Sequence, residues 1–256
     1  MTGGAAQGTV AFLEADWPAP AGVRAVTTLR GGGVSRGSYA SLNLGAHVGD
    51  DPSAVARNRE LAARALELPS APRWLAQRHG IVVHEHSGEL TGAPPEADAA
   101  IARAPLRVLA VLTADCLPVA IARRDGSAIA LAHAGWRGLA AGVLEATCGA
   151  LGAPPADLLA WLGPGIAASA FEVGPEVRAA FLEWDARAES AFTRNPRGRW
   201  QADLYQLARL RLEGLGVSAV SGGGICTYSD TERWFSARRG EPTGRMATFA
   251  WIEAGR

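Results

Sequence analysis

The chain has 256 residues, of which 48% are hydrophobic, so it is long and apolar enough to fold as one large domain around a core. Its 25 basic and 25 acidic residues cancel, which removes the main electrostatic reason to expect binding to nucleic acid or to an anionic membrane. Every basic residue is an arginine, and the lack of lysine excludes a Schiff base, a pyridoxal phosphate lysine and a Walker-type phosphate lysine.

The first half of the chain is predicted to contain a long loop followed by a helix. The loop covers Arg30–Asp50, and such a length is typical of a binding loop or a lid. Asp51 and Pro52 supply an N-cap and a proline at the first helical position, so the helix is expected to run to about Glu67. Strands are expected at Val23–Leu29, within Trp74–Val83 around His79, and at Arg107–Thr113.

A hairpin is the strongest local signal in the middle of the chain. Leu117–Ala122 and Ser127–Ala132 are apolar runs with an Asp-Gly step between them, a combination that predicts a β-hairpin. Folding the chain at this step places Cys116 and His133 on neighbouring strands, within about two residues of register. Cross-strand side chains have Cβ atoms roughly 4.5–8 Å apart, so the thiolate and the imidazole are close enough to share one metal ion or one proton.

The second half mixes helices with strands. Asp203 and Gln206 resemble a capping box that opens a helix over 204–214. Further helices are expected at Leu139–Leu151 and Pro175–Trp184, and strands at Leu158–Leu162, Val217–Val220, Ile225–Tyr228 and Met246–Ile252.

This mixture of elements indicates an α/β fold with a mixed sheet and flanking helices. Residues 1–22 are rich in Gly, Ala and Pro and are expected to form a flexible N-terminal segment. Residues 23–256 show no interior shift in composition and are expected to form a single catalytic domain.

Cys116 and His133 are two ligands of a candidate zinc site, because zinc binds thiolate and imidazole and a catalytic zinc keeps a fourth position for water or substrate. The sequence offers two sources for a third ligand. His79 lies in a turn-like Gln-Arg-His-Gly context, from which a side chain can project into a cleft. His84 and His86 alternate along a predicted strand and form a rival pair, although the polar residues around them suggest an exposed segment.

The same pair also allows a nucleophile interpretation, with Cys116 as the thiolate and His133 as its base. Asp115 is expected to point to the other side of the strand unless the strand breaks there. Cys116 can equally be a small buried hydrophobic residue. The other two cysteines, Cys148 and Cys226, are expected to be structural.

The three cysteines are odd in number and widely spaced, which argues against a disulfide framework. The sequence has no run of about 18 apolar residues that would predict a membrane span. The N-terminus carries no positive charge ahead of an apolar stretch, as a signal peptide would. We therefore expect a cytoplasmic protein with no membrane partner.

Without lysine, an anion must be held by arginine, by backbone N–H groups or by a metal. Arg137, Arg238, Arg239 and Arg245 are candidate arginines for this role. The glycine runs at 31–33 and 222–224 are weaker candidates for phosphate-binding nests, because neither has a dinucleotide-type spacing after a strand.

A set of motifs extends from about Thr28 to Ile252. The motifs are Gly32-Gly33-Val34-Ser35, Ser41-Leu42-Asn43-Leu44-Gly45, His47-Val48-Gly49-Asp50, Asn58-Arg59, Gln77-Arg78-His79-Gly80, Ala97-Asp98-Ala99, Thr113-Ala114-Asp115-Cys116-Leu117-Pro118-Val119, His133-Ala134-Gly135-Trp136-Arg137-Gly138, Gly163-Pro164-Gly165-Ile166, Phe171-Glu172-Val173, Cys226-Thr227-Tyr228, Phe235-Ser236, Arg238-Arg239 and Thr243-Gly244-Arg245. As a set they resemble the bacterial polyphenol oxidase (laccase-domain) family, whose members are also described as purine nucleoside phosphorylases and as peptidoglycan editing factors.

The resemblance implies an α/β sandwich of the cysteine-hydrolase-like type and a zinc site on His79, Cys116 and His133. The implied activities are phosphorolysis of adenosine, inosine and methylthioadenosine, and deamination of adenosine. The chain departs from the family pattern at Gly224, where an Asp is frequent, and at Ala237, where a Tyr is frequent. These departures bear on substrate preference and not on the zinc site.

A copper oxidase, as the family name suggests, is not expected from one chain. A blue-copper centre with a trinuclear copper cluster needs roughly ten histidines. The chain has five histidines, so the ligands for a laccase of that type are missing.

We therefore predict a zinc-dependent purine nucleoside phosphorylase with adenosine deaminase activity, which binds a purine nucleoside and phosphate and is a monomer or a homodimer. Asp115 is the predicted proton shuttle beside Cys116 and His133. The predicted substrate-binding residues are Arg30, Arg59 and Arg137 for phosphate, and Asn43 or Gln77 for sugar or base.

Two alternatives stay open at this point. One is a Cys–His amide hydrolase that edits peptidoglycan precursors such as a UDP-muramyl-amino acid, with Cys116 as nucleophile and His133 as base. The other is a zinc-stabilised binding protein without catalytic activity.

Overall fold

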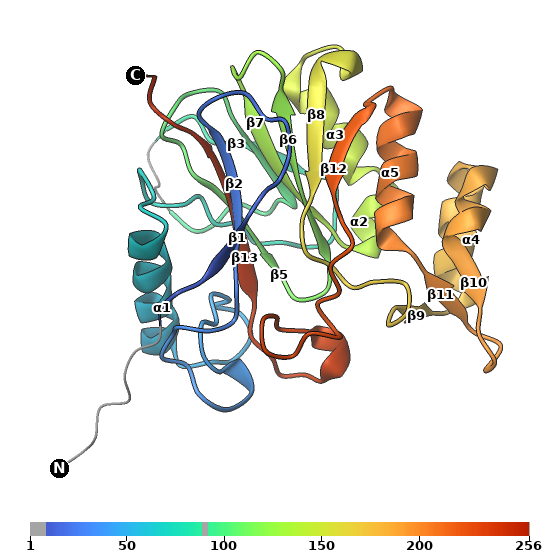
Figure 1. Ribbon diagram of the computed structural model, residues 1–256, viewed down its shortest axis with the longest axis horizontal. Helices are drawn as coiled ribbons and strands as arrows, with labels where there is room; N and C mark the ends of the chain where they lie inside the picture. The colour runs from blue at the N-terminus through green and yellow to red at the C-terminus, as the bar shows by residue number, and fades with distance from the viewer. Residues whose placement is uncertain (1–8, 89–91, 256) are drawn as a thin grey trace.

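A computed structural model describes residues 9–88 and 92–255, and in it two β-sheets lie face to face between helices (Figure 1). The smaller sheet has the strand order β1 (Phe12–Glu14), β2 (Val23–Thr28), β13 (Met246–Ile252) and β5 (Leu109–Thr113). The larger sheet has the order β12 (Ala219–Gly222), β8 (Leu158–Leu162), β6 (Leu117–Arg123), β7 (Ile129–Ala134), β4 (Ala99–Ala102) and β3 (Val83–Glu85).

The remaining elements cover these sheets or lie beside them. The α-helices are α1 (Pro52–Ala65), α2 (Trp136–Ala141), α3 (Val143–Leu151), α4 (Pro175–Trp184) and α5 (Leu204–Leu215). A small third sheet contains β10 (Phe192–Arg194), β11 (Trp200–Ala202) and β9 (Glu172–Val173) and lies next to α4 at the right of Figure 1. Short 3₁₀ helices are η1 (Gly37–Tyr39), η2 (Pro155–Asp157), η3 (Ala186–Ala191) and η4 (Ala237–Arg239).

The larger sheet is mixed in direction. β12 pairs parallel with β8 and β3 pairs parallel with β4, whereas β6 pairs antiparallel with both β7 and β8. The smaller sheet is antiparallel throughout. The predicted mixed α/β class is confirmed, and the finer assignment to the cysteine-hydrolase-like type stays a prediction.

The layers follow from the alternation of side chains along the strands. On β6, Val119 and Ile121 join the cluster that packs on the helices, whereas Ala120 and Ala122 face the smaller sheet. α1 covers the outer face of the smaller sheet through contacts such as Ala62. The order of layers is therefore α–β–β–α, and each fully buried Val, Leu or Ile stabilises it by roughly 1.5–3 kcal/mol.

The predicted hairpin is present and has the expected register. β6 and β7 pair antiparallel, with Pro118 opposite His133, and Gly126 in the connecting turn has a φ of 72°. Cys116 directly precedes β6, two residues before the partner of His133. The hairpin therefore brings this pair of residues to one end of the larger sheet.

Three predicted elements are wrong. The helix expected over Leu139–Leu151 is split into α2 and α3 because Gly142, with a φ of 101°, ends one helix and begins the next. His79 lies in no strand, since its φ of 60° is left-handed. The strand expected at Ile225–Tyr228 is reduced to one isolated bridge between Gly165 and Cys226.

Several elements were not predicted, among them β1, β4 and the third sheet. β1 pairs with β2 and Val10 is buried, so residues 9–14 are held on the smaller sheet. The flexibility expected of residues 1–8 concerns residues outside the described ranges, and the domain boundary at residue 23 stays a prediction. Along the described ranges, no helix has the length and apolarity needed to cross a membrane. The cytoplasmic location stays a prediction.

Candidate metal centre and the cavities beside it

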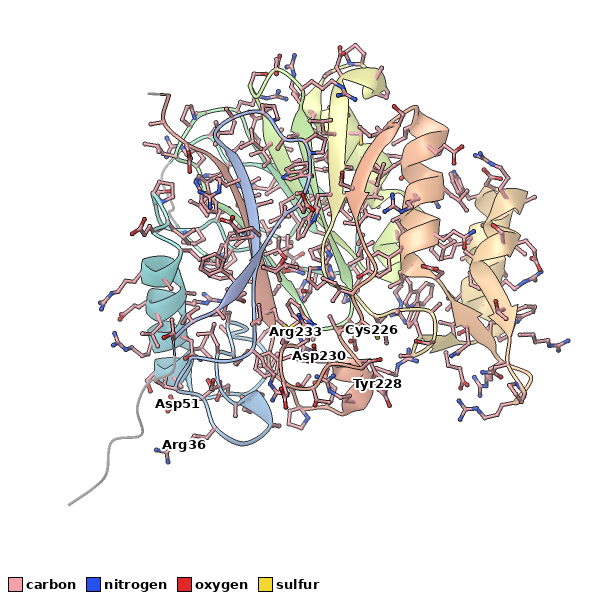
Figure 2. All side chains as sticks on the ribbon, in the orientation of Figure 1. Arg36, Asp51, Cys226, Tyr228, Asp230 and Arg233 are labelled. Carbon is pink, nitrogen blue, oxygen red and sulfur yellow. The ribbon has the colours of Figure 1, made fainter. Side chains whose placement is uncertain are left out.

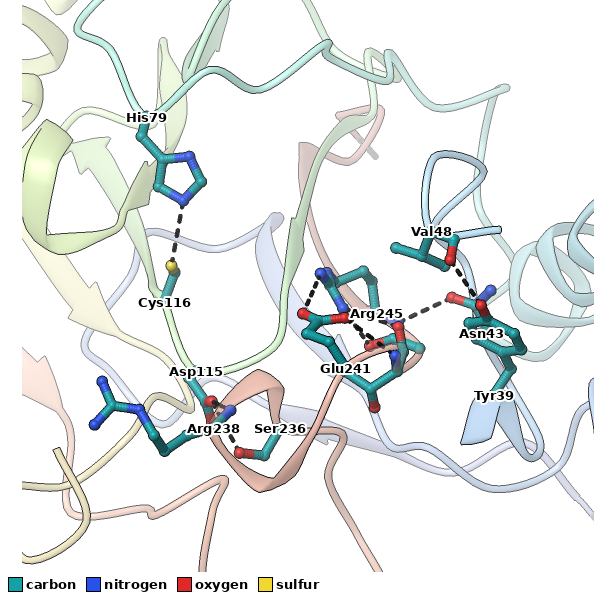
Figure 3. Close-up of polar contacts among 12 residues, drawn as sticks. Tyr39, Asn43, Val48, His79, Asp115, Cys116, Ser236, Arg238, Glu241 and Arg245 are labelled. Carbon is teal, nitrogen blue, oxygen red and sulfur yellow. Dashed lines mark hydrogen bonds and ion pairs between the residues drawn. The ribbon is translucent and has the colours of Figure 1, made fainter. Parts of the chain in front are cut away.

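Three side chains converge where the two sheets meet: those of His79, Cys116 and His133. Their ligand atoms all lie within 4.8 Å of one another, and they are the one such His/Cys/Asp/Glu group within the described residues. His79 Nε2 is 3.8 Å from Cys116 Sγ (Figure 3), and the two imidazole rings are 4.8 Å apart at 72°. The structure thus brings together all three predicted ligands and selects His79 over the rival pair.

Cys116 lies on the segment that crosses from one sheet to the other. β5 belongs to the smaller sheet and β6 to the larger one, and three residues connect them. Within this connection Asp115 has a φ of 93°, a conformation that costs a non-glycine residue free energy and that turns the chain sharply. The turn directs Cys116 toward His79 and Asp115 away from it, as Figure 3 shows.

Asp98 organises two of the three candidate ligands, although the site prediction did not include it. Its carboxylate is 1% exposed and accepts the Nδ1–H of His133 at 2.8 Å. It also accepts the backbone N–H groups of Arg78, His79 and Gly80 at 3.0, 2.8 and 2.7 Å. The carboxylate therefore leaves Nε2 of His133 free for a metal and fixes the loop that carries His79.

The pKa of the Asp98 carboxyl is about 2. Burial alone would raise it, but the hydrogen bond from His133 and those from the backbone outweigh burial. The one signal in the sequence was its position in the Ala-Asp-Ala motif just before the apolar β4, which does not by itself mark a functional residue.

Glycine at position 135 is required by the packing of α2 against the candidate ligands. A Cβ atom at Gly135 would lie 2.7 Å from Cδ2 of His79 and 2.9 Å from Sγ of Cys116. A Cβ atom at Gly138 would lie 3.0 Å from the carbonyl oxygen of Gly80. The two glycines of the His133–Gly138 motif therefore let the start of α2 approach the site.

Cys116 and His133 shift each other's protonation. Burial would raise the pKa of the Cys116 thiol, but the adjacent imidazoles of His133 and His79 lower it to about 6. Burial would lower the pKa of His133, but the Cys116 sulfur and Asp98 raise it to about 9. These shifts favour the thiolate form of Cys116, the form that binds metals and acts as a nucleophile.

Asp115, the predicted proton shuttle, is engaged elsewhere. One carboxylate oxygen accepts the hydroxyl of Thr227 at 2.6 Å, and the other accepts the Ser236 hydroxyl and the Arg238 backbone N–H, each at 2.8 Å (Figure 3). These contacts tie the connection before β6 to the loop around η4. The shuttle role of Asp115 stays a prediction.

Two adjoining cavities open beside the three residues. The first, of about 250 Å³, is lined by the three candidate ligands together with His47, Glu241 and Arg245. The second, of about 380 Å³, is lined mainly by apolar groups, among them Trp74 and Leu75. Both cavities share His47, Gln77 and Leu112 as lining residues, so they adjoin each other at these side chains.

Of the predicted substrate-binding residues, Gln77 lines both cavities and Arg59 lines the second. The Gln77 amide is already paired with the backbone N–H and carbonyl of Leu112 on β5. Arg59 extends over the indole ring of Trp74 at 3.9 Å. Its pKa is lowered to about 10 by burial.

The other predicted substrate-binding residues line neither cavity. Arg30 donates to the carbonyl oxygens of Ala40 and Thr231. Asn43 is fully buried and accepts the backbone N–H of Arg245 (Figure 3). Arg137 is exposed and lies over Trp136. The substrate-binding roles of Arg30, Asn43 and Arg137 stay predictions.

His47, Glu241 and Arg245 line the first cavity but were not among the predicted site residues. Nη2 of Arg245 is 3.0 Å from Glu241, an ion pair drawn in Figure 3. Burial and the charges of Arg245 and Arg59 lower the pKa of His47. His47 lies in the predicted loop Arg30–Asp50, and a histidine in a long loop was the available signal.

The rival ligands lie at the edge strand β3. Glu85 and Ser87 are exposed, as expected of this segment, but His86 itself is only 3% exposed. Burial and the charges of Arg73 and Arg107 lower the pKa of His86 to about 4. The positive charges of these two arginines would oppose the binding of a cation beside His86.

The remaining cysteines lie outside the candidate ligand group. Cys148 is buried in α3, and burial and Glu145 raise its pKa to about 12, in keeping with a structural role. Cys226 lies in a loop with Tyr228 and Asp230 at the bottom of Figure 2. Its sulfur accepts the Ser229 hydroxyl at 3.2 Å.

Comparison with known proteins gives consistent matches over nearly the whole chain. The family model described as multi-copper polyphenol oxidoreductase laccase matches residues 24–253. A purine nucleoside phosphorylase of Pseudomonas aeruginosa is 53% identical, over 95% of this chain and 99% of its own length. The purine nucleoside phosphorylase YfiH of Escherichia coli is 51% identical, over 94% and 98%. The crystal structure of a Neisseria meningitidis protein is 49% identical, covers 95% of this chain and 99% of its own, and superposes with a TM-score of 0.90.

Proposed function

The chain belongs to the family described as multi-copper polyphenol oxidoreductase laccase, and from this premise we propose that it is a zinc-dependent purine nucleoside phosphorylase. Relatives at 53% and 51% identity carry the name purine nucleoside phosphorylase, which supports an enzyme with small-molecule substrates. The observation that carries the proposal is the His79–Cys116–His133 group, which faces a cavity large enough to admit part of a nucleoside.

Zinc fits the donor set better than copper. A tetrahedral zinc with one thiolate and two imidazoles places the ligand atoms about 3.3–3.6 Å apart, close to the 3.8 Å between His79 and Cys116. A blue-copper site adds a weak axial ligand such as Met or Gln. The sulfur of Met246 instead accepts the backbone N–H of Phe235, and the Gln77 oxygen accepts that of Leu112. A zinc ion held by His79, Cys116 and His133 would keep a fourth position for water or substrate.

In phosphorolysis, a phosphate oxygen forms a bond to C1′ of the ribose while the bond from C1′ to the purine nitrogen breaks, and the purine leaves with a proton. A zinc ion would supply Lewis-acid stabilisation of an oxygen of the bound substrate or phosphate. Asp98 holds His133 in one orientation, and Arg245 lines the cavity wall as an ion pair with Glu241. Deamination of adenosine at the same site, with water as co-substrate, is part of the proposal.

The test is release of hypoxanthine from inosine by the purified, zinc-loaded protein. We expect release that requires phosphate, that disappears after chelation and that returns on adding zinc. Cys116→Ala supplies the background. Hypoxanthine release equal to that of Cys116→Ala, or release at the same rate with and without phosphate, would contradict the proposal.

A second candidate function has its own supporting observation. Cys116, His133 and Asp98 form a chain of thiolate, imidazole and carboxylate like that of thiol hydrolases. In this alternative the chain cleaves an amide such as a muramyl-amino-acid linkage, without metal. Metal-free protein that hydrolyses such an amide, and loses this activity to iodoacetamide, would support the hydrolase. Metal-free protein without amidase activity would exclude it.

A further inference from the structure

The two cavities beside the candidate metal centre meet at three side chains, those of His47, Gln77 and Leu112. A nucleoside consists of a base and a sugar that are joined by one bond, from N9 of the base to C1′. A nucleoside that occupies both cavities therefore has this bond, with the imidazole half of the purine, at the junction. This holds whichever of its two parts lies nearer the metal centre.

His47 is the polar side chain at the junction that is available to a ligand. Leu112 has an apolar side chain. The oxygen of the Gln77 amide accepts the backbone N–H of Leu112 at 2.8 Å, and the nitrogen of that amide donates to the Leu112 carbonyl at 2.9 Å. The imidazole of His47, in contrast, is exposed and has no hydrogen-bond partner among residues 9–88 and 92–255.

The imidazole of His47 faces the two cavities. The charged groups that act most on its pKa line one cavity or the other: Arg59 lines the second, and Arg245, Glu241 and His133 line the first. Burial and the charges of the two arginines lower the pKa of His47. At neutral pH the imidazole is therefore uncharged and carries one N–H donor and one acceptor nitrogen.

The backbone on both sides of His47 is held in place. Nε and Nη2 of Arg59 donate to the carbonyl oxygen of Leu44, at 3.0 and 2.9 Å. The Tyr39 hydroxyl donates to the carbonyl oxygen of Val48 at 2.7 Å (Figure 3). Because the loop is fixed before a ligand binds, a contact to His47 costs little free energy for ordering the backbone.

We propose that His47 donates a hydrogen bond to N7 of the purine base and is a catalytic residue for nucleoside cleavage. N7 is an acceptor in 6-oxopurines and 6-aminopurines alike, so this contact suits inosine, adenosine and methylthioadenosine equally. As the bond from C1′ to N9 breaks, its electron pair moves onto the imidazole ring of the base. A donor at N7 therefore binds the base more tightly in the transition state than in the ground state. This inference rests on the proposed function, because it takes the ligand to be a purine nucleoside.

The first measurement is calorimetric titration of the zinc-loaded protein with inosine and with 7-deazainosine, without phosphate. In 7-deazainosine a C–H group replaces N7, so the wild type should bind it about 3- to 10-fold more weakly than inosine, the effect of one neutral hydrogen bond. His47→Ala should weaken the binding of inosine by the same factor and leave that of 7-deazainosine unchanged. His47→Gln keeps a side-chain N–H donor and should retain a preference for inosine.

The matched control is His84→Ala, at equal zinc content. His84 lies on β3 and lines neither cavity, so its removal should leave the preference for inosine at the wild-type value. The second measurement is the rate of inosine phosphorolysis. Because the hydrogen bond strengthens as the base departs, His47→Ala should lower kcat by about 10- to 100-fold, more than it raises the dissociation constant of inosine.

Three results would each overturn the inference: equal binding of inosine and 7-deazainosine by the wild type, a wild-type preference in His47→Ala, or loss of the preference in His84→Ala. A preference over 3-deazainosine that His47→Ala removes, with none over 7-deazainosine, would assign the contact to N3 instead. Phosphorolysis by a wild type that binds both nucleosides equally would reject the contact and keep the proposed function. Binding that depends on N7 and on His47, in a protein without phosphorolysis, would reject the proposed activity and keep the contact.

Discussion

A single methyl group at position 135 should separate metal binding from folding. Gly135 has a φ of −65° and a ψ of 155°, which alanine adopts without strain, so Gly135→Ala tests only the space beside the site. The new Cβ would lie 2.7 Å from His79 Cδ2 and 2.9 Å from Cys116 Sγ, whereas ordinary contact begins at 3.4 Å. The ring and the sulfur must therefore move apart from it by roughly 0.7 and 0.5 Å, more than the roughly 0.2 Å that metal–ligand distances tolerate.

We expect Gly135→Ala to lower zinc affinity by about 10- to 100-fold or more, as disturbed ligand orientation does elsewhere, and to lower kcat/KM in parallel. Zinc affinity is measured by competition with a chromophoric chelator. The matched control is Gly149→Ala in α3, where a Cβ meets nothing within 4 Å and should stabilise the helix by about 0.5–1 kcal/mol without changing zinc affinity. Wild-type zinc affinity in folded Gly135→Ala would refute the reasoning.

Three further predictions test the neighbouring groups. Asp98→Asn should weaken zinc binding by about 10- to 100-fold, because it weakens the acceptor that orients His133 and the His79 loop. The same competition assay measures the affinity, and an unchanged affinity would argue against this role of Asp98. In metal-free protein, the rate at which iodoacetamide alkylates Cys116, followed by mass spectrometry, should rise with pH through about 6 and level off by pH 7.5. An inflection above pH 8 would contradict the lowered pKa of the Cys116 thiol. His86 has a pKa of about 4 when folded, below its unfolded value of about 6.5, so the unfolded chain takes up this proton first as pH falls. As the pH falls from 6.5 to 4, the free energy of unfolding of the wild type should therefore decrease by roughly 1–3 kcal/mol more than that of His86→Gln. The measurement is the urea midpoint at each pH, and an equal decrease in the two proteins would contradict the prediction.

The proximity of Cys116 and His133 was predictable because the sequence signal for the hairpin lies in the short segment between them. Cys116 and His133 are joined by two apolar runs and an Asp-Gly turn, and the turn fixes their register. His79 is different, since it lies in an irregular loop whose position depends on Asp98. Spacing left it as one of two options, and the family resemblance, not local physics, favoured it.

Asp98 and the division into two sheets were beyond sequence reasoning. A lone Asp among alanines has no periodicity or spacing that marks four donors around it. Apolar runs predict strands equally well in either sheet, so nothing in β5 or β6 indicates that the chain changes sheet between them. The long helix over 139–151 failed for a local reason, because one glycine in its middle adopts a left-handed conformation.

The crossing between β5 and β6 would couple metal binding to the stability of the fold. Cys116 lies on that crossing, and the His79 loop is likewise bonded to both sheets, through Gln77 to β5 and through Asp98 beside β4. An ion held by these residues would link the two sheets. At a free concentration 1,000-fold above its dissociation constant, it would raise the free energy of unfolding by about 4 kcal/mol. Because proteases cleave the unfolded chain, metal binding would then also slow proteolysis.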